Sequence, residues 1–274
     1  MRLLFITNTP KIASIADKAG VDWIFIDLEV KGKQERQSGR NTVISSHSIE
    51  DIKKVKAVVK NSKVMIRINP LGEWSKKEID DVVNSGAEII MLPYFKTSDE
   101  VEEFINLVDN RVKTCLLVET MEAVGNIDNI LDIRGIDYIH IGLNDIHIQR
   151  KTDFMFEFLA DGYIDILADK IKQKNIPFGF GGVAYMQSDL LPLAKDIITE
   201  HYRLGSTGVI LSRSFIQYNN QALREFETEF IDKVKEIRKI EKELQHEDKS
   251  FFEKNKEIVK RDIYKIKDSI KVKK

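Results

Sequence analysis

The chain has 274 residues, of which 42% are hydrophobic and 32% are charged. Its 43 Lys and Arg nearly balance its 44 Asp and Glu, so a formal net charge of −1 gives no argument for a nucleic acid or membrane partner. A single cysteine, Cys115, excludes an internal disulfide and is typical of a reducing, cytoplasmic compartment, and no apolar run approaches the roughly 18 residues of a membrane span.

Short apolar runs recur along the first 215 residues or so. They are rich in Ile, Val, Leu and Phe and do not alternate with polar residues, which is typical of strands buried on both faces of a parallel sheet. The predicted strands are residues 3–7, 23–28, 64–68, 89–92, 114–118, 138–141, 177–180 and 208–211. Cys115 lies inside one of these runs, where a small buried hydrophobe is expected rather than a nucleophile.

Between the runs lie segments whose apolar residues are three and four positions apart, the spacing of amphipathic helices. The predicted helices are residues 11–19, 49–60, 76–85, 98–108, 123–131, 157–174 and 190–204. Pro10 is placed for the first turn of a helix, and the pairs Ser75 with Glu78 and Thr97 with Glu100 have the spacing of capping boxes. Eight alternating strand and helix units predict a (β/α)8 TIM barrel over residues 1–218.

Residues 219–274 form a second, highly charged segment with two apolar stripes at helical spacing. The stripes are Phe226, Phe230, Val234, Ile237 and Leu244, then Phe251, Ile258, Val259, Ile263, Ile266 and Ile270. One interpretation is a helical hairpin packed on its own barrel. We expect instead an oligomerisation arm, because two one-sided stripes need something to cover them.

Charged residues close several of the predicted strands, at the barrel end where catalysis takes place in this fold. Asp27 and Glu29 follow one run and share a face by the two-residue period of a strand. Arg67 lies inside another apolar run, where a guanidinium is costly to bury unless it meets an anion. These three residues are the predicted catalytic group.

Glu119 and Asp145 close the next pair of neighbouring strands. Carboxylates are hard oxygen ligands that suit Mg2+ or Mn2+, with water and substrate completing the shell. The sequence therefore predicts a divalent metal site at Glu119 and Asp145. Arg213, after the last run, is a candidate substrate-binding residue, and the glycine-rich turn at 179–182 lacks a nucleotide-binding fingerprint.

Five pieces of the chain resemble the HpcH/HpaI aldolase and citrate lyase beta-subunit family, in order and at family-like spacing. They are residues 21–29 (VDWIFIDLE), 66–70 (IRINP), 86–93 (GAEIIMLP), 117–123 (LVETMEA) and 135–145 (GIDYIHIGLND). The resemblance implies a metal-dependent TIM barrel that cleaves or forms a carbon–carbon bond of a pyruvate-like 2-oxo acid, with an aldehyde as second partner. It also implies a homo-oligomer, a trimer or hexamer.

The resemblance also implies roles for single residues. Glu119 and Asp145 would hold the metal, Arg67 would bind the oxo group and stabilise the enolate, and backbone amides at Leu143 and Asn144 would hold the substrate carboxylate. A metal and an arginine on one oxygen stabilise the charge that develops there.

One position departs from the aldolase branch, which has a histidine acting through water as general base where this chain has Val30. The candidates to replace it are Glu29, Lys31, His47 and His147. Two alternatives to the 2-oxo-acid lyase follow: a citrate-lyase-like enzyme for acyl-CoA thioesters, and a non-catalytic barrel subunit that lacks the usual base.

Overall fold

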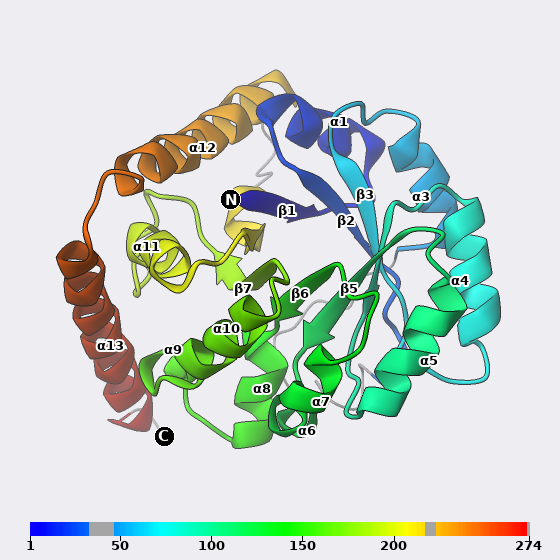
Figure 1. Cartoon of the computed structure of the whole chain (residues 1–274). Helices are drawn as coiled ribbons and strands as arrows, with labels where there is room; N and C mark the ends of the chain where they lie inside the picture. Colours follow the sequence, from blue (N-terminus) through cyan, green and yellow to red (C-terminus); the bar gives the residue numbers. More distant parts are fainter. Residues whose placement is uncertain (33–46, 217–222, 273–274) are drawn as a thin grey trace.

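Eight parallel strands close a barrel in simple chain order, from β1 beside β2 round to β8 beside β1 (Figure 1). This is a computed structural model, and it describes residues 1–32, 47–216 and 223–272. The strands are β1 Arg2–Ile6, β2 Trp23–Asp27, β3 Lys63–Arg67, β4 Ile89–Leu92, β5 Lys113–Val118, β6 Tyr138–Ile141, β7 Phe178–Val183 and β8 Gly208–Leu211. The predicted (β/α)8 barrel and all eight predicted strands are confirmed.

Alternate residues of each strand fill the inside of the barrel, and the others pack outward against helices. The inner set is Leu4, Trp23, Phe25, Met65, Ile89, Met91, Cys115, Leu117 and Tyr138. Burial raises the pKa of the Cys115 thiol, which fits the prediction of a buried hydrophobe. Asp27, Arg67 and Glu119 each follow an inner residue by two positions, so they continue the inner face to the carboxyl end of the barrel.

Helices surround the barrel and cover its outer face (Figure 1). They are α1 Pro10–Ala19, α3 Ile49–Lys56, α4 Ser75–Asn84, α5 Ser98–Val108, α6 Met121–Gly125, α7 Ile127–Leu131, α8 Leu143–Arg150, α9 Glu157–Ala160, α10 Tyr163–Gln173 and α11 Ala194–Leu204, with a 3-10 helix, η1, at Arg213–Ile216. Pro10 begins α1, and Thr97 with Glu100 forms a capping box at α5, as predicted.

The helices differ from the prediction in several places. Ser75 and Glu78 form no capping box, because Ser75 already lies inside α4 and Glu78 binds Asn69 instead. The predicted helix 123–131 is two short helices, α6 and α7, separated by Asn126, whose backbone is not helical. The predicted helix 157–174 is also two helices, α9 and α10, because Gly162 between them has a φ of 82°. Helix α8 was missed, because its polar and apolar residues do not separate onto two faces.

The C-terminal segment folds as two helices, α12 Leu223–Leu244 and α13 Lys249–Val272. Helix α12 closes the ring between α11 and α1, where Phe230 packs against Phe5 of β1 with ring centroids 4.8 Å apart. Helix α13 lies outside α11 and α9 (Figure 1). There the Asn255 side chain donates to Glu200 Oε1 over 2.9 Å.

Both apolar stripes are covered largely by the chain itself. Phe226, Phe230, Val234, Ile237, Leu244, Val259 and Ile263 are all buried, whereas Ile258 stays 38% exposed. The stripes therefore give no argument for an oligomerisation arm, since a hairpin packed on its own barrel accounts for them. The predicted boundary at 218 and 219 lies outside the described residues. No helix in the described ranges has the length and apolar character needed to cross a bilayer.

Candidate active site

An arginine and two acids meet at the carboxyl ends of β2 and β3, where Asp27 and Arg67 are paired in register. Arg67 donates from Nε to Asp27 Oδ1 over 2.8 Å and from Nη2 to Asp27 Oδ2 over 2.7 Å. Glu29 Oε2 lies 3.3 Å from Arg67 Nε. Both acids are almost fully buried, and the Arg67 side chain is 15% exposed. The three predicted catalytic residues are thus in contact.

The acids around Arg67 hold it firmly in its charged form. Burial opposes the charge, but Asp27, Glu29 and Glu119 outweigh burial and raise the pKa of Arg67. Its third guanidinium nitrogen, Nη1, has no hydrogen-bond partner among the described residues. Nη1 is therefore the atom on which a substrate oxygen could be bound without breaking the pair with Asp27.

Glu119 follows β5 and is 4% exposed. Its Oε1 accepts a hydrogen bond from the backbone N–H of Tyr94 over 3.1 Å, and Tyr94 has a left-handed φ of 52°. Such strained backbone is retained where the surroundings enforce it, commonly at functional sites. On its other side Glu119 packs against Gly142, where a Cβ would lie 2.9 Å from Glu119 Cβ and 3.1 Å from Oε2.

Asp145 is 7% exposed and lies in the first turn of α8, directly after Leu143 and Asn144. This segment therefore begins a helix, whose first backbone N–H groups have no partner within the helix. Those N–H groups can serve an anion, which fits the expected roles of Leu143 and Asn144. The Asn144 amide also donates to Asp145 Oδ1 over 3.3 Å.

The donor set at this end of the barrel fits a divalent cation. Glu119 packs against Gly142, three residues before Asp145, and both acids are buried. Arg67 contributes one positive charge at this end of the barrel, where there are four acids: Asp27, Glu29, Glu119 and Asp145. Within the described ranges no group of three or more His, Cys, Asp or Glu is arranged to hold a metal. A metal ion here would thus take two protein carboxylates, with water and substrate as its other ligands.

The structure places the four candidates for the missing base in different surroundings, and only two of them lie beside the Asp27–Arg67 pair. His47 lies against β2, and its Nδ1 accepts a hydrogen bond from the Asp27 backbone N–H over 3.0 Å. Glu29 lies on Arg67. Lys31 instead places its ammonium 4.1 Å from the centre of the Trp74 ring, and His147 Nδ1 is 2.8 Å from Thr152 Oγ1. His47 and Glu29 are therefore the two candidates beside the Asp27–Arg67 pair.

His140, which sequence reasoning left without a role, lies on the inner face of β6 with 1% of its surface exposed. Its Nε2 is 3.1 Å from the carbonyl oxygen of Gly181 and donates to it, whereas Nδ1 has no partner among the described residues. Burial and the nearby Arg67 lower the pKa of His140 to about 4. The ring is therefore neutral at physiological pH.

We expect His140 to make the protein sensitive to mild acid. The pKa of His140 is about 4 in the folded protein and near 6.5 in the unfolded chain. The neutral ring therefore contributes fully to the free energy of unfolding above pH 6.5, and this contribution is lost as the pH falls toward 4. The loss should reach about 2 kcal/mol by pH 5. His140→Gln, which keeps a donor toward Gly181, should reduce this loss in urea unfolding at pH 7 and pH 5. Exposed His246→Gln should not change it, and equal pH dependence in all three proteins would contradict the prediction.

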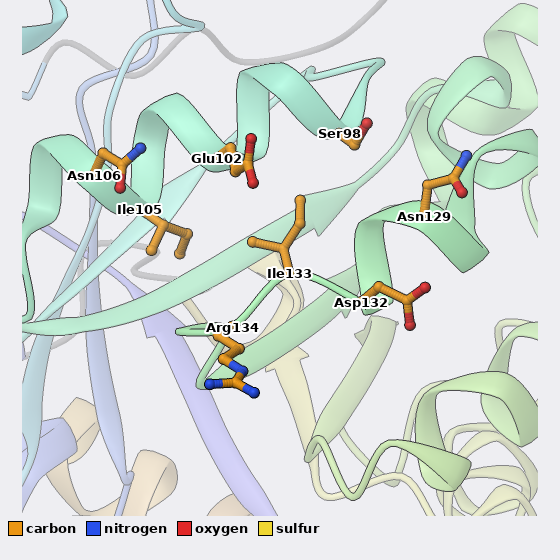
Figure 2. A pocket seen from close by; sticks show the side chains of 8 residues that line it. All are labelled: Ser98, Glu102, Ile105, Asn106, Asn129, Asp132, Ile133 and Arg134. Carbon is orange, nitrogen blue, oxygen red and sulfur yellow. The ribbon is translucent and has the colours of Figure 1, made fainter.

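Arg213 lies on η1 after β8 and is exposed. In the part of the chain that the structure describes, no contact joins it to Asp27, Arg67 or Glu29. Its substrate-binding role stays a prediction. A shallow surface cleft of about 590 Å3 lies elsewhere, between α5 and the segment from α7 to β6 (Figure 2). Side chains such as Glu102, Asn129 and Arg134 line this cleft, and none of the predicted site residues does.

The fold and these contacts define a (β/α)8 barrel with buried acids and an arginine at the end where such barrels carry out catalysis. The family model for HpcH/HpaI aldolase/citrate lyase matches residues 2–155. The chain belongs to this family.

Two named relatives are similar in sequence to about half of the chain. A 2-keto-3-deoxy-L-rhamnonate aldolase of Shigella dysenteriae is 26% identical over 171 residues, 51% of this chain and 58% of the relative. A hydroxypyruvate/pyruvate aldolase of Roseobacter denitrificans is 28% identical over 165 residues, 49% of this chain and 58% of the relative. This chain thus spans less than two thirds of the length of these relatives.

Solved structures share the fold. An HpcH/HpaI aldolase from Desulfitobacterium hafniense superposes with a TM-score of 0.63 at 15% identity, covering 82% of this chain and 92% of the other. The citrate synthase SbnG superposes with a TM-score of 0.60 at 15% identity, covering 84% and 94%. At this identity the likeness supports the barrel fold alone.

Proposed function

We propose that this protein is a divalent-metal-dependent carbon–carbon lyase of the class II aldolase type, acting on a small pyruvate-like 2-oxo acid through an enolate. The observation that carries the proposal is Arg67, fixed by Asp27 and Glu29 on the inner face of the barrel within the electrostatic reach of Glu119. The family membership and the names of the aldolase relatives support the same reaction class.

Arg67 has the central role in the proposed reaction. When the carbon–carbon bond breaks, its electron pair moves into the 2-oxo acid, and negative charge grows on the former carbonyl oxygen. Arg67 Nη1 donates to that oxygen while Nε and Nη2 stay on Asp27 and Glu29, so the guanidinium need not reorient during the reaction. The backbone amides of Leu143 and Asn144 hold the substrate carboxylate.

Glu119 and Asp145 would hold Mg2+ or Mn2+, which when bound supplies Lewis-acid stabilisation of the same developing charge. Proton transfer needs a group beside the Asp27–Arg67 pair, where His47 and Glu29 lie. Because Nδ1 of His47 accepts from the Asp27 N–H, its neutral ring carries its proton on Nε2. In this arrangement His47 can donate a hydrogen bond but cannot accept a proton at Nδ1.

The test compares an easy and a demanding reaction. Oxaloacetate decarboxylation needs only stabilisation of the pyruvate enolate, so we expect wild type with Mn2+ to catalyse it. Aldol cleavage also needs a base for the substrate hydroxyl, and with Val30 in place we expect it to be weak. Val30→His should raise it at least about tenfold, because a placed acid–base group typically contributes ~10^2–10^4 in rate. Both reactions are measured by coupled pyruvate assays.

Val272→His, at an 88% exposed valine on α13, is the matched control and should change neither rate. If neither reaction occurs with Mn2+ or Mg2+ in wild type and in Val30→His, the proposal of a 2-oxo-acid lyase is wrong. The acyl-CoA thioester lyase and the non-catalytic subunit would then be the remaining alternatives.

We also propose that the protein is cytoplasmic and forms a homo-oligomer, a trimer or hexamer. Support for the oligomer comes from the family resemblance. Light scattering of the intact chain measures its mass directly.

A further inference from the structure

Asn69, two residues beyond Arg67, is buried and uses both the oxygen and the nitrogen of its amide group in hydrogen bonds. Its Oδ1 accepts from the backbone N–H groups of Val30 and Lys31, each over 2.9 Å. Its Nδ2 donates to Glu78 Oε1 over 2.7 Å. Only 7% of Asn69 is exposed. A side chain that accepts from two successive backbone amides fixes the path of that segment.

Glu78 on α4 accepts hydrogen bonds from both the side chain and the backbone of Asn69. The backbone N–H of Asn69 lies 3.3 Å from each Glu78 carboxylate oxygen. Burial raises the pKa of Glu78, although the hydrogen bonds from Asn69 and the charge of Lys31 oppose the rise. Asn69 therefore links α4 to the segment that leaves β2.

Trp74 gives this segment a second attachment. The Lys31 ammonium lies 4.1 Å from the centre of the Trp74 ring, and the indole N–H donates to the Pro70 carbonyl over 3.1 Å. The ring also packs tightly on Gly72, where a Cβ would lie 2.5 Å from it. Lys31 and Gly72 thus both contact the indole ring.

The segment depends on these contacts because Val30 does little to anchor it. Val30 is 48% exposed, so its side chain gains little from burial. Directly before it, Glu29 donates its backbone N–H to Asp27 Oδ1 over 3.2 Å and places Oε2 on Arg67 Nε. A shift of Val30 and Lys31 would therefore move Glu29 and loosen one side of the arginine.

We propose that Asn69 is a positioning residue for the reaction: by holding the Val30 and Lys31 amides it keeps Glu29 on Arg67 and so fixes the guanidinium. The inference rests on the proposed function. Asn69 itself contacts no reacting atom, and its effect passes through Glu29.

The test removes the hydrogen bond between Asn69 and Glu78 and then restores it with the donor on the other residue. Asn69→Asp keeps an oxygen for the two amides but sets a carboxylate against Glu78. Adding Glu78→Gln returns a donor to the pair. We expect Asn69→Asp to lower kcat for oxaloacetate decarboxylation at least about tenfold, because small displacements of a catalytic group are costly. KM should change less, and the double variant should recover to within about threefold of wild type.

A second readout does not depend on activity. The chain has two tryptophans, so Trp23→Phe leaves Trp74 as the sole reporter at this contact. In that background Asn69→Asp should increase acrylamide quenching of Trp74, and the added Glu78→Gln should reverse the increase. Asn106→Asp, at an exposed position on α5, is the matched control and should change neither kcat nor quenching. Asn69→Ala, which removes the acceptor without adding charge, replaces Asn69→Asp if that variant does not fold.

Increased quenching with unchanged kcat would show a segment held by Asn69 without effect on Arg67, and would overturn the proposal. Unchanged quenching and unchanged kcat would overturn it as well. If neither oxaloacetate decarboxylation nor aldol cleavage occurs in wild type and Val30→His, the proposed function has failed, and Trp74 quenching alone decides whether Asn69 holds the segment.

Discussion

Glu119→Ala is expected to abolish metal-dependent turnover and to weaken Mn2+ binding at least about 100-fold, while the barrel stays folded. Glu119 is one of two buried acids proposed to hold the ion, and removing it leaves a single carboxylate, that of Asp145. Asp145→Ala should have the same effect. Titration calorimetry with Mn2+ measures the loss directly. Unchanged Mn2+ affinity in both variants would show that the metal site is elsewhere.

A glycine variant tests the same site without removing any ligand. Gly142 has a φ of −87°, which alanine adopts without strain, but its Cβ would press on Glu119. Gly142→Ala should therefore displace the carboxylate and weaken Mn2+ binding about tenfold. Gly125→Ala is the control, because a Cβ there meets nothing within 4 Å. Equal Mn2+ affinity in the two glycine variants would argue against Glu119 as a ligand.

Arg67→Lys is expected to lower kcat/KM for oxaloacetate decarboxylation at least about tenfold, equivalent to roughly 1.4 kcal/mol of transition-state stabilisation. Lysine keeps the positive charge among Asp27, Glu29 and Glu119. It cannot, however, pair with Asp27 through two nitrogens and donate from a third in a fixed plane. Steady-state kinetics measure the effect.

Arg134→Lys, an exposed arginine of the surface cleft (Figure 2), provides the control and should keep wild-type kinetics. Wild-type kinetics in Arg67→Lys would remove the guanidinium from the mechanism.

The sequence predicts the barrel well because parallel strands buried on both faces give long apolar runs with little ambiguity. It also predicts that Asp27 and Arg67 reach the same end of the barrel, since both continue buried strands that end there. The strand period predicts which side chains reach the carboxyl end of the barrel, but it does not predict their hydrogen-bond partners.

Asn69 shows what was missed and why. The spacing of Ser75 and Glu78 matches a capping box, so Glu78 was assigned to its own helix rather than to Asn69. Helix α8 lacks a one-sided pattern because it packs against α6, α9 and β7 and has no exposed residue. The apolar stripes on α12 and α13 predict from the sequence only that another surface covers them. Whether the cover is the chain itself or another subunit depends on tertiary packing.

The closure of the ring by α12 has a consequence for how the protein is made. The first strand, β1, pairs with β8, and its Phe5 is covered by Phe230 of α12, more than 200 residues later in the chain. During synthesis β1 therefore has one unpaired edge and an apolar face until nearly the whole chain has left the ribosome. An exposed strand edge is a site for aggregation. Nascent chains that stall before residue 208 should consequently be the species that need chaperones most.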